Sequence, residues 1–222
     1  MNNLNHIAFI MDGNGRWGEK KGKGRNFGHL KGVETVKKIV NASIKLNIPI
    51  LTFYVFSSEN WKRPIKERNY LFKLIKRYFS LELKNIVTQG IKINIFGDIN
   101  KFTSDLKFIL KKKIKLTKKN KKIIVNLAIN YGSKIEILQA LKKNNKITTI
   151  KEFEKNLYTK NLPNPDLLIR TGGYQRLSNF LLWQLAYTEL FFLKKLWPDF
   201  NFNDLKKIIK KYKQIRRNFG KI

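Results

Sequence analysis

The 222-residue chain contains no cysteine. This absence excludes disulfide bonds, thiol nucleophiles and cysteine-ligated zinc as sources of its stability or chemistry. Only two histidines occur, so a histidine-rich metal site is not expected either. The sequence also lacks the GxxxxGK[ST] motif, and any phosphate-binding loop must therefore be built in another way.

Long hydrophobic runs are missing as well. The most apolar segment, NFLLWQLAYTELFFL at 179–193, is interrupted by Gln184, Thr188 and Glu189. It is shorter and more polar than the run of about 20 apolar residues that spans a bilayer. Near the N-terminus, polar and charged residues precede any sufficiently long apolar segment, so no signal peptide is expected. We therefore expect a soluble cytoplasmic protein.

Acidic residues are scarce, with 15 Asp and Glu against 47 Lys and Arg, giving a net charge of +32. Such an excess is typical of proteins that bind nucleic acids or the anionic surface of a membrane. The lysines are accompanied by many asparagines, isoleucines and phenylalanines, whose codons are rich in A and T. The charge can therefore reflect base composition, and by itself it does not assign a partner.

The sequence predicts one α/β domain over residues 1–222, because short runs of β-branched and aromatic residues alternate with amphipathic segments. The short runs are nearly continuous in apolar residues, which is typical of parallel strands covered on both faces. We expect a mainly parallel sheet of about six strands, flanked by helices. Strands are predicted at 6–11, 49–56, 91–97, 122–129, 166–170 and 189–193, and helices at 29–47, 66–88, 103–116, 134–143, 178–187 and 204–217. The polar stretches 111–122 and 141–156 are interpreted as solvated helix ends and loops.

Polar loops follow four of the predicted strands, where ligands bind in sheets of this kind. They are DGNGRW, SSENWKRP, NYG and RTGGYQRLSN. Four such loops at one edge of a sheet indicate a site more strongly than any one of them alone.

The first loop has the residues of an anion site. Gly13 and Gly15 allow the backbone to approach a ligand closely, and Arg16 and Arg25 supply forked donors that suit phosphate. The helix that follows would present its positive end nearby. The alternative is a tight turn in which Asp12 caps a helix.

A second anion site is predicted after the fifth strand, where Arg170, Arg176 and Ser178 surround Gly172 and Gly173. Arg170 closes an apolar strand, and a buried guanidinium without a partner would be costly. Ser178 is in addition a good candidate for a helix N-cap.

An acid between two phosphate sites suggests a metal ion. Asp12 can hold Mg²⁺ against phosphate oxygens, since Mg²⁺ often uses only one or two carboxylates. Glu189 is the candidate second acid, or else a solvent-facing strand residue. The rings of Trp17 and Trp61 would suit an allylic carbocation, and core packing is the alternative role for each.

Taken together, these segments resemble the cis-prenyltransferase family. The resemblance rests on HIAFIMDGNGRWGEKKGKGRNFGHLKG, LTFYVFSSENWKRP, LAINYG, DLLIRTGGYQRLSNFLLWQLAYTELFF and LWPDF, which occur in the family's order from His6 nearly to the C-terminus. It implies a homodimeric, magnesium-dependent enzyme that adds isopentenyl diphosphate repeatedly to an allylic diphosphate such as farnesyl diphosphate. Each addition makes a cis double bond, and the product is a long-chain polyprenyl diphosphate such as the undecaprenyl carrier of cell-wall synthesis. The lack of a DDxxD pair argues against the all-helical trans-type synthases.

The resemblance also implies roles for individual residues. Asp12 matches the family's essential aspartate, which engages magnesium and diphosphate, and Glu189 matches the second magnesium ligand. Asn60 corresponds to the proposed proton acceptor. The matching substrate-binding positions are Gly13, Asn14, Gly15, Arg16, Trp17, Arg25 and His29 for the allylic substrate; Ser57, Ser58, Glu59, Trp61 and Arg63 in the second loop; and Arg170, Arg176, Leu177 and Ser178 for isopentenyl diphosphate.

A growing apolar product needs a dry space, so a hydrophobic tunnel is expected between the sheet and the helix 66–88. The candidate lining residues are Tyr70, Leu71, Leu74, Ile75, Phe79, Leu81 and Leu83, for most of which ordinary core packing is the alternative. Val55 is bulkier than the small residue common at its position and would narrow the tunnel. The final length of the product does not follow from the sequence.

The chain departs from the family pattern at two places. Residues 133–136 read SKIE, where the family often has glycine, arginine, tryptophan and aspartate. Near the C-terminus, Asn218 stands in place of an arginine. If the tail contacts isopentenyl diphosphate, Arg216 or Arg217 would have to compensate.

Two other functions compete with the synthase. A nucleic-acid-binding protein would focus lysines along one face, whereas the sequence places arginines at strand ends, so no specific nucleic-acid partner is expected. A catalytically silent partner subunit is disfavoured because Asp12, Asn60 and Arg170 are intact. Peripheral contact with an anionic membrane at its inner face is left open.

Overall fold

The computed structural model describes residues 2–143 and 146–217, and within them the chain forms a single six-stranded sheet. All neighbouring strands are parallel, in the order β3-β4-β2-β1-β5-β6. All six predicted strands are confirmed. Their bounds are β1 His6–Ile10, β2 Ile50–Ser57, β3 Ile91–Phe96, β4 Ile123–Tyr131, β5 Leu167–Arg170 and β6 Glu189–Phe192.

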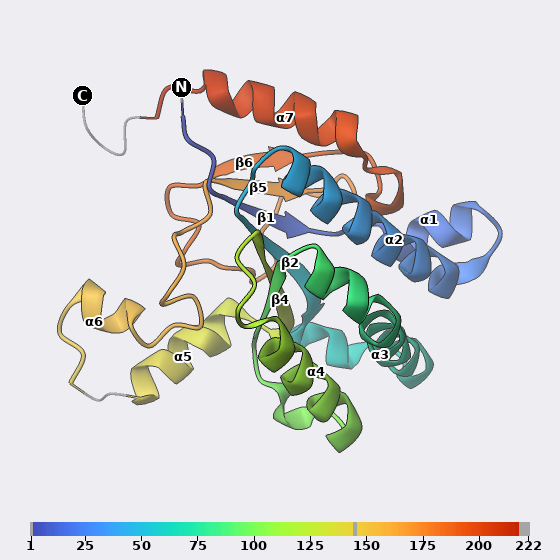
Figure 1. The fold of residues 1–222 in the computed structure, drawn as a ribbon, viewed down its shortest axis with the longest axis horizontal. Coiled ribbons are helices and arrows are strands. Elements are labelled where there is room, and N and C mark those ends of the chain that lie inside the picture. The colour runs from blue at the N-terminus through green and yellow to red at the C-terminus, as the bar shows by residue number, and fades with distance from the viewer. Residues whose placement is uncertain (1, 144–145, 218–222) are drawn as a thin grey trace.

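Helices cover both faces of the sheet (Figure 1). On one face, α2, α3, α4 and α7 pack onto the main core, which includes Phe9, Phe53 and Phe79. On the other face, Phe180 and Leu181 from the chain before β6 pack onto β1, β4 and β5. The helices are α1 Asn14–Lys20, α2 Gly24–Lys45, α3 Ile65–Thr88, α4 Ser104–Thr117, α5 Ser133–Lys143, α6 Ile150–Glu154 and α7 Phe202–Gln214, with 3₁₀ turns η1 Ser58–Lys62, η2 Ile99–Lys101 and η3 Trp197–Asp199. None of the described helices is long and apolar enough to cross a membrane.

The predicted helix at 178–187 is wrong. These residues form turns, and Ser178, Asn179 and Leu181 have φ values of 51°, 61° and 47°. A right-handed helix cannot contain such left-handed residues, so Ser178 is not a helix N-cap. The side chains of Phe180, Leu181 and Leu185 are nevertheless buried, and this apolar spacing explains why the segment resembled a helix.

Two short helices were not predicted, and one helix begins early. α1 lies within the glycine-rich first loop, and α6 lies within the polar stretch at 141–156. Thr149 and Glu152 form a capping box that starts α6. α2 begins at Gly24, five residues before the predicted start. Asn218, at which the sequence differs from the family pattern, lies outside the described residues.

Strand order determines which loops meet. β1 lies between β2 and β5, and Ile10 at the end of β1 is level with Arg170 at the end of β5. The loops after β1, β2 and β5 therefore share one edge of the sheet. This edge carries the site described next.

Candidate active site

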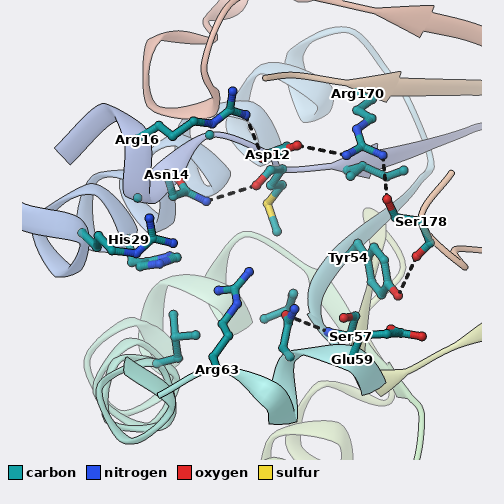
Figure 2. Close-up of a pocket in the computed structure, with 18 of the residues that line it drawn as sticks. Asp12, Asn14, Arg16, His29, Tyr54, Ser57, Glu59, Arg63, Arg170 and Ser178 are labelled. Carbon is teal, nitrogen blue, oxygen red and sulfur yellow. Dashed lines mark hydrogen bonds and ion pairs between the residues drawn. The ribbon is translucent and has the colours of Figure 1, made fainter. Parts of the chain in front are cut away.

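A cavity of about 600 Å³ opens at the carboxyl edge of the sheet. Figure 2 shows its polar side chains converging from the loops after β1, β2 and β5 and from α2. Thirteen of the predicted site residues line it, which supports the expectation that these loops form one site. They are Asp12, Gly13, Asn14, Gly15, Arg16, Arg25, His29, Ser57, Glu59, Asn60, Arg63, Arg170 and Ser178.

Asp12 lies between two arginines (Figure 2). Its Oδ1 accepts a hydrogen bond from Arg16 Nη2 at 3.1 Å, and its Oδ2 accepts one from Arg170 Nη2 at 3.0 Å. Arg16 belongs to the first predicted anion site and Arg170 to the second. The acid therefore joins the two sites, and it does not act as the cap of α1, whose N-cap is Gly13.

Gly172 makes this pairing possible. It has a φ of 92°, which favours glycine, and its carbonyl accepts a hydrogen bond from Arg16 Nη2 at 2.8 Å. A Cβ at this position would lie 2.7 Å from Arg16 Nη2 and 2.9 Å from Asp12 Cβ. A side chain here would push apart the acid and the arginine.

Arg170 is held rigidly, with a side chain only 4% exposed. Besides Asp12, it donates from Nη1 to Ser178 Oγ at 2.9 Å and to the carbonyl of Arg176. Tyr54 Oη in turn donates to the carbonyl of Ser178 at 3.3 Å, which ties the loop to β2. The left-handed turn at 178 thus serves to aim the hydroxyl of Ser178 at the guanidinium.

The loop after β2 is fixed by its own hydrogen bonds. Asn60 Oδ1 accepts from the backbone N–H of Ser57 at 3.1 Å, and this contact forms one half of a capping box. Glu59 accepts from Asn179 Nδ2 at 2.7 Å, which links this loop to the one after β5. Burial raises the pKa of Glu59, but hydrogen bonds from Asn179 and from its own loop lower it by more. Glu59 is therefore ionised at neutral pH.

A basic cluster forms the opposite wall of the cavity. Arg25 and His29 come from α2 and Arg63 from the segment before α3, and all three contact Glu67. Burial and the charge of Arg63 lower the pKa of His29, although Glu67 raises it in part. His29 is therefore neutral at pH 7, with its Nε2–H donated to the carboxylate.

Five other predicted residues lie outside the cavity lining. Trp61 packs in the core against Phe56 and Phe102 and donates Nε1–H to Asn130, and Trp17 donates to Asp199. The contacts of Trp61 correspond to the core-packing alternative, whereas Trp17 is only partly buried and stacks on Phe27 near the surface. The remaining three are Ser58, Arg176 and Leu177.

Glu189 lies at the opposite edge of the sheet from Asp12. It is the first residue of β6 and is paired in register with Leu167 of β5, which in turn is paired with Ile7 of β1. Ile7 precedes Asp12 by five residues. About 16 Å of strand therefore separates the two acids within one chain. Arg217 Nε approaches Glu189 at 3.6 Å and its Nη1 approaches Asp166 at 3.3 Å, so Arg217 does not compensate for Asn218 at the site of its own chain.

The sequence analysis missed three residues that shape the site, namely Tyr54, Asn179 and Glu67. Tyr54 was treated only as part of a strand, and Asn179 was assigned to a helix. Glu67 follows Arg63 by four residues at the start of a predicted helix, a spacing typical of ion pairs. That spacing was the available signal for Glu67, whereas nothing local identified the other two.

A second, mainly apolar cavity of about 110 Å³ adjoins the first and shares Met11, Asn14, His29, Val55 and Leu71 with it. It lies between α2, α3 and the sheet, where the hydrophobic tunnel was expected. Of the predicted lining residues, Leu71, Leu74, Ile75 and Phe79 contribute, whereas Tyr70, Leu81 and Leu83 do not. Leu81 is instead exposed to solvent.

The donor set fits a magnesium ion that arrives with a phosphate ligand. The described residues contain no group of three His, Cys, Asp or Glu that could hold a metal without other ligands. Asp12 is 27% exposed and faces the cavity. Its two arginine partners leave lone pairs free, since an ionised carboxylate has about four. One carboxylate completed by phosphate oxygens is a common arrangement for Mg²⁺.

The fold and site define a class of protein: a parallel α/β protein with an arginine-lined polar cavity beside an apolar one. Comparison with known proteins identifies the family. The profile described as "Putative undecaprenyl diphosphate synthase" matches residues 10–220. The chain belongs to this family of prenyltransferases.

Relatives share nearly the full length of the chain. An isoprenyl transferase of Oceanobacillus iheyensis is 42% identical and covers 98% of this chain and 90% of its own. A ditrans,polycis-undecaprenyl-diphosphate synthase ((2E,6E)-farnesyl-diphosphate specific) of Pasteurella multocida is 45% identical, with coverages of 97% and 94%. Lavandulyl diphosphate synthase from Lavandula x intermedia, solved with dimethylallyl diphosphate, has a TM-score of 0.93 at 34% identity and 98% coverage of both chains.

Proposed function

We propose that the chain is a magnesium-dependent cis-prenyltransferase that adds isopentenyl diphosphate repeatedly to an allylic diphosphate. Farnesyl diphosphate is the proposed primer, and undecaprenyl diphosphate, a lipid carrier for the cell wall, is the proposed product. The observation that carries the proposal is the position of Asp12, which is bound by Arg16 on one side and Arg170 on the other and lines a polar cavity that adjoins an apolar one.

Arg16, Arg25 and Arg63 are proposed to bind the allylic diphosphate. During condensation the C–O bond of this substrate breaks and its electron pair leaves with the diphosphate. Guanidinium groups that are already in place stabilise that developing charge without reorganising. His29 is neutral and so adds a hydrogen-bonding group and no further positive charge to this wall.

Arg170 and Ser178 are proposed to bind isopentenyl diphosphate, with Arg176 at the margin. The double bond of this substrate attacks the allylic carbon, and a proton then leaves to form the new double bond. Holding the two diphosphates in register supplies much of the rate, because the reaction becomes effectively unimolecular. Asn60, which lines the cavity, is proposed as the proton acceptor.

Asp12 would hold the magnesium ion, which when bound neutralises charge on the diphosphates. The apolar cavity is proposed to receive the growing chain, since its walls are aliphatic and aromatic apart from Asn14 and His29, which it shares with the polar cavity. Repeated addition requires a place where the product stays dry while its head group remains among the arginines. The two adjoining cavities meet this requirement at Met11, Val55 and Leu71.

We further propose a homodimer. β6 is an edge strand of the described sheet, and Leu190 on it is 43% exposed. Exposed edge strands are commonly covered by a partner. Because Glu189 cannot reach Asp12 in its own chain, its proposed role as a magnesium ligand would require a partner subunit. Peripheral contact with an anionic membrane is proposed as a way to pass on a lipid product.

The experiment is to incubate the purified protein with Mg²⁺, farnesyl diphosphate and radiolabelled isopentenyl diphosphate, and to size the products. We expect a narrow distribution of long polyprenyl chains that disappears when the metal is chelated. Absence of products, or a single addition only, would reject the proposed function. Sedimentation of the same sample tests the dimer, which a monomeric species would exclude.

A further inference from the structure

Glu67 lies beside the polar cavity and has no role in the scheme above. Glu67 lies in the first turn of α3, and its side chain is only 11% exposed. Its Oε2 accepts a hydrogen bond from Arg25 Nε at 3.3 Å. Its Oε1 accepts from Arg63 Nη1 at 3.1 Å and from His29 Nε2 at 3.3 Å.

The three partners of Glu67 come from two separate parts of the chain, and all of them line the polar cavity. Arg25 has one other acidic partner, the more exposed Glu19, whose Oε1 lies 3.3 Å from Arg25 Nη1. Long arginine side chains lose considerable rotamer freedom when they are held in place. A carboxylate shared by Arg25 and Arg63 restricts that freedom before a ligand arrives.

Glu67 also connects the polar cavity to the apolar one. Leu71, one helical turn further along α3, lines both cavities, and Leu74 and Ile75 on the next turn line the apolar cavity. Residues four apart lie on the same face of a helix. The contacts of Glu67 therefore fix the start of the helix that forms one wall of the apolar cavity.

The charge state of the cluster is consistent with such a role. Burial raises the pKa of Glu67, but hydrogen bonding to Arg25 and the charges of Arg63 and Arg25 lower it by more. Glu67 is thus ionised, and with His29 neutral the cluster has a net charge of about +1. It remains able to attract an anionic head group.

We propose that Glu67 is a positioning residue that holds Arg25, Arg63 and His29 in the arrangement that receives the allylic diphosphate. This inference rests on the proposed function. Among the residues that the structure describes, no hydrogen bond or ion pair joins Arg25, His29, Arg63 or Glu67 to Asp12 or Arg170. Loss of the Glu67 carboxylate is therefore expected to weaken binding of the allylic diphosphate and to leave binding of isopentenyl diphosphate unchanged.

The test compares Glu67→Gln with Glu82→Gln. Glu82 also lies on α3 and also pairs with α2, through Lys37 Nζ at 2.8 Å. Its partner Lys37 lines neither cavity, whereas all three partners of Glu67 line the polar one. In Glu67→Gln we expect the KM for the allylic substrate to rise about ten- to a hundredfold, because misplaced binding groups cost up to this factor. The KM for isopentenyl diphosphate should change less than about twofold, and Glu82→Gln should change neither constant.

An unchanged KM for the allylic substrate in Glu67→Gln would overturn the proposal, since the carboxylate would then not position the binding groups. A lower KM would overturn it too, since the carboxylate would then only compete with the substrate. An equal rise of both constants would overturn it as well, because that indicates a general structural loss. If the wild-type protein does not condense the substrates, the proposed function fails, and the positioning role is still tested by NMR. The chain has only two histidines, and Glu67→Gln should lower the pKa of His29. An unmoved His29 titration would exclude the contact.

Discussion

Replacement of Asp12 by asparagine tests the central pairing of the site. The substitution keeps the shape of the side chain and removes the charge that Arg16 and Arg170 share. Two guanidinium groups are then left near each other without a counter-charge. One of them, on Arg170, is almost completely buried.

The expected loss of stability follows from exposure. The pair with Arg16, which is 39% exposed, contributes at most about 1 kcal/mol. The buried Arg170 loses a charged hydrogen-bond partner, which costs about 1.5–3 kcal/mol. Because Asp12 is partly exposed, we expect a total of about 2–3 kcal/mol, or a fall in Tm of about 4–12 °C for a chain of this length.

Activity should fall further than stability. If Asp12 holds the metal and orders both arginines, kcat should decrease at least about 100- to 1,000-fold, as when one preorganised electrostatic group is removed. The assays are calorimetry for Tm and incorporation of labelled isopentenyl diphosphate for turnover. Near-normal turnover would reject the catalytic role of Asp12.

A double-mutant cycle provides the control. Asp12→Asn and Arg170→Met should couple by about 0.5–3 kcal/mol, because side chains in direct contact are not additive. Strictly additive losses would refute the ion pair as a source of stability. Glu34→Gln, which removes an exposed pair with Lys31 on α2, should change neither Tm nor turnover appreciably.

Three further predictions concern separate parts of the chain. Burial lowers the pKa of His6 to about 4 from its ordinary 6.5. Between these pH values the unfolded chain therefore binds one more proton than the folded chain. The contribution of neutral His6 to the free energy of unfolding should be fully present above pH 6.5, and about 3 kcal/mol of it should be lost by pH 4. Thermal melts of His6→Gln across this range should show a shallower loss, and an identical slope would contradict the assignment. Val55→Ala widens the junction of the two cavities and should lengthen the products, whereas an unchanged chromatographic distribution would show that Val55 does not limit chain growth. Gly172→Ala should lower kcat and destabilise the chain by at least about 1 kcal/mol, because residue 172 has a positive φ and the added Cβ would clash with Arg16 and Asp12. A variant with normal turnover would show that the loop can move aside.

Local sequence patterns determined the strands and most of the helices. Runs such as HIAFI and LLIR are apolar throughout because both faces of a parallel strand are covered. The polar loops at strand ends followed from the same pattern, whereas the full set of thirteen cavity-lining residues, His29 on α2 among them, followed from the resemblance to the cis-prenyltransferase family. The turn at 178–187 was mistaken for a helix because apolar spacing alone does not reveal left-handed residues such as Ser178 and Asn179.

Only the tertiary structure decided which of these loops meet. Asp12 and Arg170 are 158 residues apart and touch because β1 lies next to β5, an order that no local pattern contains. The parallel direction of β6 places Glu189 at the opposite edge of the sheet, because Glu189 begins that strand and does not follow it. The contacts of Glu67 also depend on the tertiary structure. Its carboxylate on α3 can reach Arg25 and His29 on α2 only after both helices have packed on the same face of the sheet.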